Sequence, residues 1–241
     1  MRNPVGAPGR TRTASLPRAV LVLFDIDGTL LHGRPEAHTH AMVAAMAEVW
    51  QVPARPDDIW QLDPAGRTDR EIARLVLRGH GVADDAIDDR IHEWMDMAAR
   101  LHATEAALHA SPVAAPDADA VAARLREEGA EVALLTGNLQ PIGRAKVAAA
   151  GLGHHFGPGG GFGSDAEERA DLVGIARGRA AAAHPDDEVV VVGDTPRDVR
   201  AARMAGVRVV AVTTGAFGGE ALAGADHVAS DLTGALHLLL A

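Results

Sequence analysis

The chain has 241 residues, and 47% of them are hydrophobic but only 3% aromatic, so Ala, Val and Leu must fill a sizeable core. A net charge of -10 disfavours nucleic acids and anionic membranes as partners, and the lack of cysteine excludes disulfides, thiol catalysis and zinc–thiolate sites. Because no apolar run is long enough to span a membrane, we expect a cytoplasmic protein, either monomeric or homodimeric.

The N-terminal region changes character after about a dozen and a half residues. Residues 1–17 combine arginines with Gly, Pro, Thr and Ser and lack the apolar middle of a secretory signal. We expect a flexible tail here, and an organellar targeting segment is the alternative. The run at 19–24 is apolar and rich in β-branched residues, which predicts a buried parallel strand that ends at Asp25.

Residues 36–110 have the periodicity of helices. Apolar residues recur along two stripes, Ala41, Met42, Ala45, Met46, Val49 and Trp50 in the first and Ile87, Ile91, Trp94, Met95, Ala98 and Leu101 in the second. Between the stripes, the segment Thr68-Asp69-Arg70-Glu71 predicts a capping box that opens a further helix. This region therefore forms a helical unit of its own.

From Ser111 onward, predicted helices and strands alternate. Helices are expected near 117–128, 141–150, 167–183, 196–205 and 232–240, and strands at 132–135, 161–163, 189–192 and 208–212. Such alternation indicates a parallel sheet, which the early strand should join. We predict an α/β protein with a Rossmann-like parallel-sheet core, residues 18–32 and 113–241, and an inserted helical cap domain, residues 33–112.

Polar residues follow three of the predicted strands at their carboxyl ends, where ligands of parallel sheets bind. They are Asp25 and Asp27, then Thr136, Gly137 and Asn138, and finally Gly193, Asp194 and Thr195. Carboxylates that converge in one place repel each other unless a cation lies between them. Hard oxygen ligands without His or Cys favour Mg²⁺, which also binds substrate phosphates.

Three segments carry a resemblance to the haloacid-dehalogenase-like hydrolase superfamily. They are Phe24-Asp25-Ile26-Asp27-Gly28-Thr29-Leu30, Leu134-Leu135-Thr136-Gly137-Asn138 and Val192-Gly193-Asp194-Thr195-Pro196-Arg197-Asp198. The resemblance covers roughly residues 19–241, with the fold of that superfamily and a helical cap as in its phosphoglycolate-phosphatase-like and β-phosphoglucomutase-like members.

The resemblance implies a role for each motif residue. Asp25 attacks phosphorus and forms an aspartyl-phosphate, while Asp27 protonates the leaving alcohol and then assists water. Mg²⁺ binds to the carboxylates of Asp25 and Asp194 and to the backbone carbonyl of Asp27, with Asp198 as a further candidate. The Thr136 hydroxyl holds phosphoryl oxygens. The remaining motif residues expected next to the substrate are Gly28, Thr29, Gly137 and Asn138. An acid at position 27 marks phosphatases and phosphomutases, which excludes carbon–halogen cleavage.

The resemblance also implies a basic residue in a further motif, between the second and the last of these segments. Two residues are candidates for it. Arg169 lies 25 residues before Asp194, close to the loop that precedes the helix expected near 167–183, and a guanidinium suits phosphate recognition. Lys146 lies ten residues after Thr136, within a predicted helix. We favour Arg169 as the catalytic cation and retain Lys146 as a candidate substrate-binding residue.

The long interval between the first two motifs contains the predicted cap. It spans 111 positions from Asp25 to Thr136, against 58 from Thr136 to Asp194, which is too long for a structureless loop. A cap can exclude water and select the substrate. Gly66-Arg67-Thr68-Asp69 is the candidate specificity loop, with Arg67 as a candidate substrate-binding cation; a capped surface turn is the alternative.

Other features have simpler interpretations. The stretch from Thr195 to Asp198 is a good helix start, so Asp198 could cap a helix, bind metal or do both. Gly157-Pro158-Gly159-Gly160-Gly161 lacks the context of a phosphate-binding loop and is expected to be a flexible turn. His38 and His40 do not face each other along a helix, and the sequence favours no zinc site there or at His154-His155.

The sequence therefore predicts a Mg²⁺-dependent phosphatase that acts on a small phosphorylated metabolite. Two alternatives remain open. One is a sugar-phosphate phosphomutase, and the other is a non-catalytic binding protein on the same fold.

Overall fold

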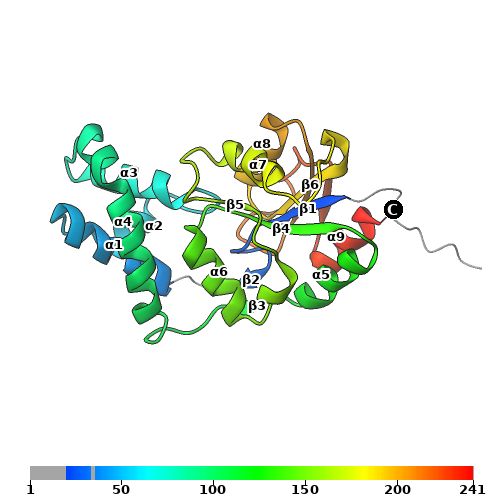
Figure 1. The fold of residues 1–241 in the computed structure, drawn as a ribbon, viewed down its shortest axis with the longest axis horizontal. Helices are drawn as coiled ribbons and strands as arrows, with labels where there is room; N and C mark the ends of the chain where they lie inside the picture. Colours follow the sequence, from blue (N-terminus) through cyan, green and yellow to red (C-terminus); the bar gives the residue numbers. More distant parts are fainter. Residues whose placement is uncertain (1–19, 34–35, 241) are drawn as a thin grey trace, which may run out of the picture.

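The computed structural model describes residues 20–33 and 36–240, and the predicted tail at 1–17 lies outside them. Six parallel strands form the main sheet in the order β5-β4-β1-β6-β7-β8 (Figure 1). In chain order they are β1 (Leu21–Phe24), β4 (Glu131–Thr136), β5 (Gly161–Phe162), β6 (Val189–Gly193), β7 (Arg208–Val212) and β8 (His227–Ala229).

Strand β1 lies inside the sheet and is buried on both faces. Its side chains alternate: Val22 and Phe24 pack on one side, and Leu21 and Leu23 on the other. The first side is covered by α5 (Ala118–Glu127) and α9 (Leu232–Leu239), and the second by α7 (Arg169–Gly178) and α8 (Pro196–Met204). Burial on both faces explains why the sequence here is a continuous apolar run rather than an alternating one.

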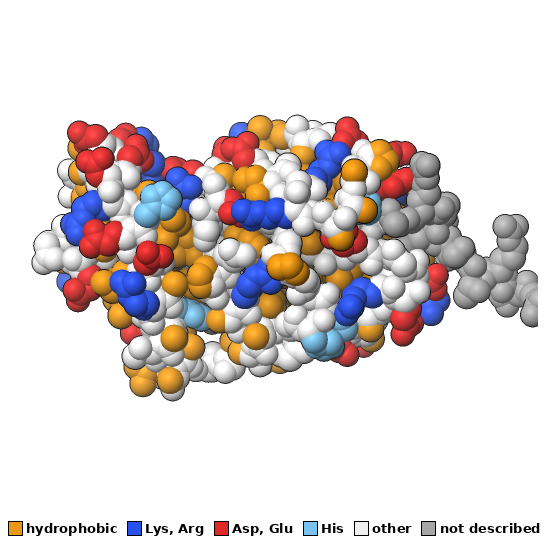
Figure 2. Space-filling view, viewed as in Figure 1, with side chains coloured by type: hydrophobic (Ala, Val, Ile, Leu, Met, Phe, Trp, Pro, Cys, Tyr) orange, Lys and Arg blue, Asp and Glu red, His pale blue; other side chains and the backbone are white. Residues whose placement is uncertain are grey.

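The helical unit comprises α1 (Glu36–Trp50), α2 (Pro56–Trp60), α3 (Asp69–Gly79) and α4 (Asp84–Glu105). These helices share an apolar core around Met42, Met46 and Trp94 that is separate from the cores on the two sheet faces. The chain leaves and re-enters the sheet region through an antiparallel ribbon of β2 (Leu31–His32) and β3 (Val113–Ala114). In Figure 2 a notch separates the lobe of α1–α4 from the sheet lobe, and acidic and basic side chains are interspersed over this face.

Helix α6 (Gln140–Ala149) lies between the helical unit and the sheet region (Figure 1). Leu139 and Ile142 belong to the apolar core of the helical unit, so the two parts of the molecule are packed together through this segment. Two short 3-10 helices, η1 (Gly153–His155) and η2 (Asp186–Glu188), complete the elements of the described residues. None of the helices among these residues has the length and apolar character needed to cross a membrane.

The predicted fold class is confirmed, with local corrections to its elements. The helix predicted at 167–183 covers only Arg169–Gly178, since a turn follows Gly178. Strand β8 and the β2–β3 ribbon were missed because such short, partly exposed strands give no periodic signal. Thr68 caps α3 as predicted. The Glu71 carboxylate contacts Arg67 instead of completing the predicted capping box.

The core of the helical unit provides a test of its stability. Trp94 is completely buried, and its indole N–H donates to the Met42 carbonyl at 3.2 Å. Trp94→Ala should lower the free energy of unfolding by about 3–5 kcal/mol, because it leaves a cavity in this core. Leu108→Ala, at a side chain that is 73% exposed, should change it by less than about 0.5 kcal/mol. Urea denaturation measures both, and equal effects would contradict the proposed core.

Candidate active site

The residues predicted from the strand ends line one cavity. Asp25 follows β1, Thr136 ends β4, and Asp194 follows β6. Together with Asp27 they line a cavity of about 340 Å³ between the sheet and the helical unit. The helical unit contributes the side chains of His38, Thr39, Met42, Ile59, Trp60, Arg67, Asp69 and Ile72. The cavity thus has a carboxylate-rich floor and a partly apolar roof.

Three buried carboxylates gather on this floor. Oxygen atoms of Asp25, Asp194 and Asp198 lie within 4.8 Å of one another. The Arg169 guanidinium donates to Asp25 Oδ1 at 2.7 Å and also to Asp198 Oδ1. Arg169 is itself only 4% exposed, so this cation is buried together with the carboxylates that it neutralises. The basic residue favoured from the sequence therefore contacts the predicted nucleophile.

Crowding of these carboxylates shifts their proton affinity. Burial raises the pKa of Asp25 well above its ordinary value, and the charges of Asp198 and Asp194 add to the shift although Arg169 opposes it. Burial and the charge of Asp198 raise the pKa of Asp194 to about 7. Burial is the main cause of both shifts, and the neighbouring carboxylates add to them.

Asp198 caps a helix and also contacts Arg169. Its Oδ2 accepts hydrogen bonds from the Thr195 hydroxyl at 2.6 Å and from the Thr195 amide at 3.1 Å, which completes a capping box at the start of α8. Its Oδ1 accepts from Arg169. The helix start predicted from Thr195-Pro196 is confirmed, and the same carboxylate belongs to the buried cluster.

Asp27 points to a second, separate cation. Its two oxygens accept from Lys146 Nζ at 2.9 and 2.8 Å, and Oδ2 also accepts from the Asn138 amide at 2.8 Å. Burial favours the protonated form of Asp27, but Lys146 and Asn138 outweigh it and lower the pKa of this carboxyl. The side-chain amide of Asn138 also donates to the Thr136 hydroxyl at 2.6 Å, so this network connects the first two motifs.

His38 joins this network without having been predicted from the sequence as a site residue, and Asp69 was expected only as part of the specificity loop. His38 of α1 contacts Lys146 Nζ through Nδ1 at 3.1 Å and Asp69 through Nε2 at 2.8 Å. Asp69 in turn accepts from the Leu139 backbone amide at 2.7 Å. The spacing of His38 to His40 does not indicate this contact, and no signal in the sequence pairs a residue of one helix with Lys146 of another.

The predicted specificity loop lies against the sheet region. Arg169 donates to the Gly66 carbonyl at 3.2 Å, and the Asp69 amide donates to the Gly137 carbonyl at 2.8 Å. A Cβ on Gly137 would lie 1.9 Å from the Arg67 carbonyl oxygen, so glycine is required for this close approach. The Arg67 guanidinium, however, contacts Glu71 and the carbonyls of its own loop.

The donor set fits a hard divalent cation. Its ligand atoms are carboxylate oxygens, which Mg²⁺ prefers, and the three carboxylates share a single guanidinium, that of Arg169. The Thr29 hydroxyl orients Asp194 through a 3.1 Å hydrogen bond to Oδ1. Gly28 has a φ of +93°, and a Cβ there would lie 2.3 Å from Asp194 Oδ2. Loop backbone and carboxylate are thus packed in direct contact.

This combination of a parallel sheet with strand-end aspartates and a helical unit after the first strand agrees with a sequence comparison. Residues 20–206 match the model of the haloacid dehalogenase-like hydrolase family. The chain therefore belongs to this family and is a hydrolase.

Individual relatives are similar over different lengths. The chain is 31% identical over 198 residues to a phosphoglycolate phosphatase from Cereibacter sphaeroides, which is 80% of this chain and 85% of the relative. It is 36% identical over 116 residues to a phosphoserine phosphatase from Thermus thermophilus, but that match covers only 42% of this chain and 41% of the relative.

Solved structures support the fold alone. CbbY from Rhodobacter sphaeroides, in complex with phosphate, has a TM-score of 0.64 at 22% identity and covers 89% of this chain and 95% of its own. A hydrolase from Pseudomonas syringae has a TM-score of 0.62 at 20% identity and covers 92% of this chain and 98% of its own.

Gly28→Ala tests the contact between the loop and Asp194. The added Cβ would collide with the carboxylate, so Mg²⁺ affinity, measured by calorimetry, should fall at least about tenfold. Gly129→Ala is a matched control, since Gly129 has a similar φ of +88° but nothing within 4 Å of the Cβ position. Gly129→Ala should lower the free energy of unfolding by about 1–2 kcal/mol through backbone strain alone and leave Mg²⁺ affinity unchanged. Equal loss of Mg²⁺ affinity in both variants would refute the argument.

Proposed function

We propose that this hydrolase is a Mg²⁺-dependent phosphatase that releases orthophosphate from a small phosphorylated metabolite through an aspartyl-phosphate on Asp25. The observation that carries the proposal is the position of Asp25 at the floor of the cavity, between the Arg169 guanidinium and two further buried carboxylates. The phosphatases among its relatives support the reaction class.

The proposed chemistry has two displacement steps. In the first, an Asp25 carboxylate oxygen bonds to phosphorus, the bond from phosphorus to the ester oxygen breaks, and Asp27 gives its proton to the departing alcohol. In the second, a water oxygen attacks phosphorus while Asp27 takes a proton from the water. The bond from phosphorus to Asp25 then breaks, which restores the carboxylate and releases orthophosphate.

Asp27 must gain a proton before the first step, although its present contacts favour the ionised form. The substrate itself provides the reason for a change. A phosphate group in the cavity brings negative charge close to Asp27 and raises its proton affinity. Lys146 then keeps the carboxylate ionised and ready to accept a proton once the alcohol has left.

The remaining residues hold and neutralise the reacting group. We assign Arg169 to orient Asp25 and to compensate the charge of the phosphoryl oxygens, and the Thr136 hydroxyl with the Gly137 amide to bind those oxygens. Asp25, Asp194 and the Asp27 carbonyl would bind Mg²⁺, with Asp198 next to them. When bound, Mg²⁺ supplies charge neutralisation between the nucleophile and the phosphate.

The phosphatase activity is tested by a screen of phosphorylated metabolites that includes phosphoglycolate and phosphoserine, with Mg²⁺ and with a chelator. Orthophosphate release should require the metal and should fall at least about 10⁴-fold in Asp25→Asn, since the amide cannot act as nucleophile. Asp187→Asn, at an exposed residue of η2, should retain full activity.

The other outcomes of this screen separate the alternatives. An isomeric sugar phosphate in place of orthophosphate would indicate a phosphomutase. Uniform absence of turnover in the folded protein would favour the non-catalytic protein and overturn the proposal.

Distinct roles of the two buried cations give a second prediction. With p-nitrophenyl phosphate, whose leaving group needs little protonation, Lys146→Met should keep most of the first-step rate, because Lys146 acts on Asp27. Arg169→Lys should slow that step by about 100-fold, because one ammonium cannot bridge Asp25 and Asp198 as the guanidinium does. Rapid-quench measurement of the p-nitrophenol burst distinguishes them, and Arg179→Lys is the control. A larger loss in Lys146→Met would reverse the assignment.

A further inference from the structure

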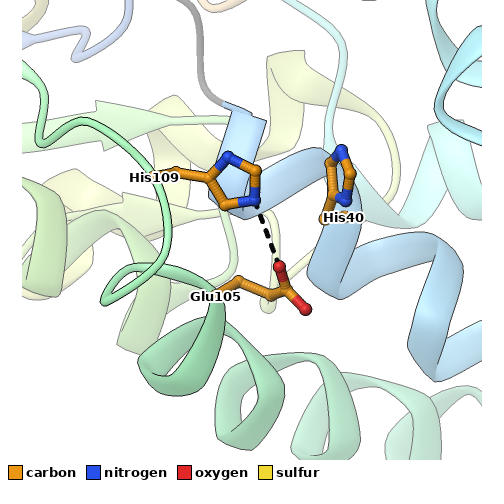
Figure 3. A group of neighbouring side chains, drawn as sticks. All are labelled: His40, Glu105 and His109. Atoms are coloured by element: carbon orange, nitrogen blue, oxygen red, sulfur yellow. Dashed lines mark hydrogen bonds and ion pairs between the residues drawn. The ribbon is translucent and has the colours of Figure 1, made fainter.

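A second group of potential metal ligands lies in the helical unit, away from the buried aspartates. It consists of His40 on α1, Glu105 at the end of α4 and His109 just after it. Nitrogen and oxygen atoms of these side chains lie within 4.8 Å of one another. Figure 3 shows the two imidazoles facing each other above the Glu105 carboxylate.

We propose that His40, Glu105 and His109 bind a divalent first-row transition-metal ion, with Zn²⁺ as its representative. Two imidazoles and one carboxylate are a donor set that Zn²⁺ accepts readily, whereas Mg²⁺ prefers oxygen ligands alone. Ligand atoms around a tetrahedral Zn²⁺ are roughly 3.4 Å apart, so small side-chain rotations would bring this group to bonding distance. A water molecule would complete the coordination.

The environment of His109 is the second observation. Its Nε2 lies 3.2 Å from Glu105 Oε2, and its Nδ1 lies 3.5 Å from Glu36 Oε2. With a metal on Nε2 next to Glu105, Nδ1 would donate to Glu36. Metal-binding histidines usually donate their other N–H to a carboxylate or carbonyl in this way, which fixes the ring and strengthens the ligand. Glu36 is thus placed to orient His109.

The exposure of the group favours entry of an ion. His40 is exposed, and its ring centre lies 4.8 Å from that of His109.

The competing cluster of Asp119, His154 and His155 is less suitable. Both imidazoles there approach the same carboxylate oxygen, at 2.7 Å for His155 and 3.6 Å for His154. The His154 ring also contacts the Gly151 carbonyl through Nδ1 at 3.0 Å. A metal ion would have to displace these contacts, so this cluster serves as the control in the experiment.

The position of the proposed site gives it a structural consequence. It joins the first turns of α1 to the end of α4 and to the segment 106–112, which leads on to β3. Glu36 and Ala106 also line a cavity of about 310 Å³ that extends to Asp27 and Lys146. Bound metal would therefore tie together the two ends of the helical unit.

Calorimetric titration of the full chain with ZnCl₂, in the presence of millimolar Mg²⁺, tests the proposal. The wild-type protein should bind one Zn²⁺ in addition to any at the aspartates, with a rise in Tm of a few degrees at saturating Zn²⁺. His40→Gln and His109→Ala should each weaken this binding at least about 100-fold, and Glu36→Gln about tenfold. His154→Ala and Asp194→Asn should retain it. Cobalt substitution should give tetrahedral absorption bands that disappear in the two histidine variants.

Several results would overturn the proposal. Absence of Zn²⁺ binding at micromolar concentration would do so, as would unchanged binding in both His40→Gln and His109→Ala. Loss of the site in Asp194→Asn would place Zn²⁺ at the buried aspartates, and loss in His154→Ala would place it at the competing cluster. Circular dichroism of each variant, and the exposed position of His40, separate loss of binding from loss of the fold.

Discussion

Repulsion among Asp25, Asp194 and Asp198 is the constraint to which the rest of this site responds. Three carboxylates are buried within contact distance of one another, and one guanidinium, Arg169, lies among them. If all are ionised, two negative charges remain, which matches the charge of one divalent cation. Without such an ion the cluster can only take up protons, as the raised pKa values of Asp25 and Asp194 indicate. The site is therefore built around a charge that the protein alone does not balance.

The same constraint connects the helical unit to the sheet. Arg169 donates to the Gly66 carbonyl as well as to the carboxylates, so the cation that contacts the proposed nucleophile, Asp25, also contacts the loop of the helical unit. On the other side of the cavity, Asp69 contacts both His38 and the Leu139 amide. Charge neutralisation on the floor and placement of the roof thus depend on the same few side chains. A substrate must fit between them, which makes the helical unit the natural source of specificity.

The parts of the site that could be predicted are those fixed by local sequence. Polar residues after apolar strands must meet at one edge of a parallel sheet, so Asp25, Thr136 and Asp194 could be placed together without a structure. Likewise, Thr195 and Asp198 could be recognised as a helix start because a capping box spans only four residues. The contact of His38 with Lys146 joins α1 to α6, and Arg67 was drawn to its neighbour Glu71. The partner of His38 is not encoded by spacing along the chain, whereas Arg67 and Glu71 form an i,i+4 pair whose contact such spacing allows.

The sequence offered Arg169 and Lys146 as alternatives for one catalytic cation. In the structure the two residues contact different carboxylates. A planar guanidinium can donate to Asp25 and Asp198 at once, which suits a cation that must keep two carboxylates in fixed relation. An ammonium is a compact charge with freely directed donors, and Lys146 Nζ contacts Asp27, Asn138 and His38 together. In the proposed mechanism Asp25, the nucleophile, must stay ionised and fixed in position, whereas Asp27, the acid–base residue, must exchange its proton. Separate cations allow one carboxylate to be held while the other changes its charge.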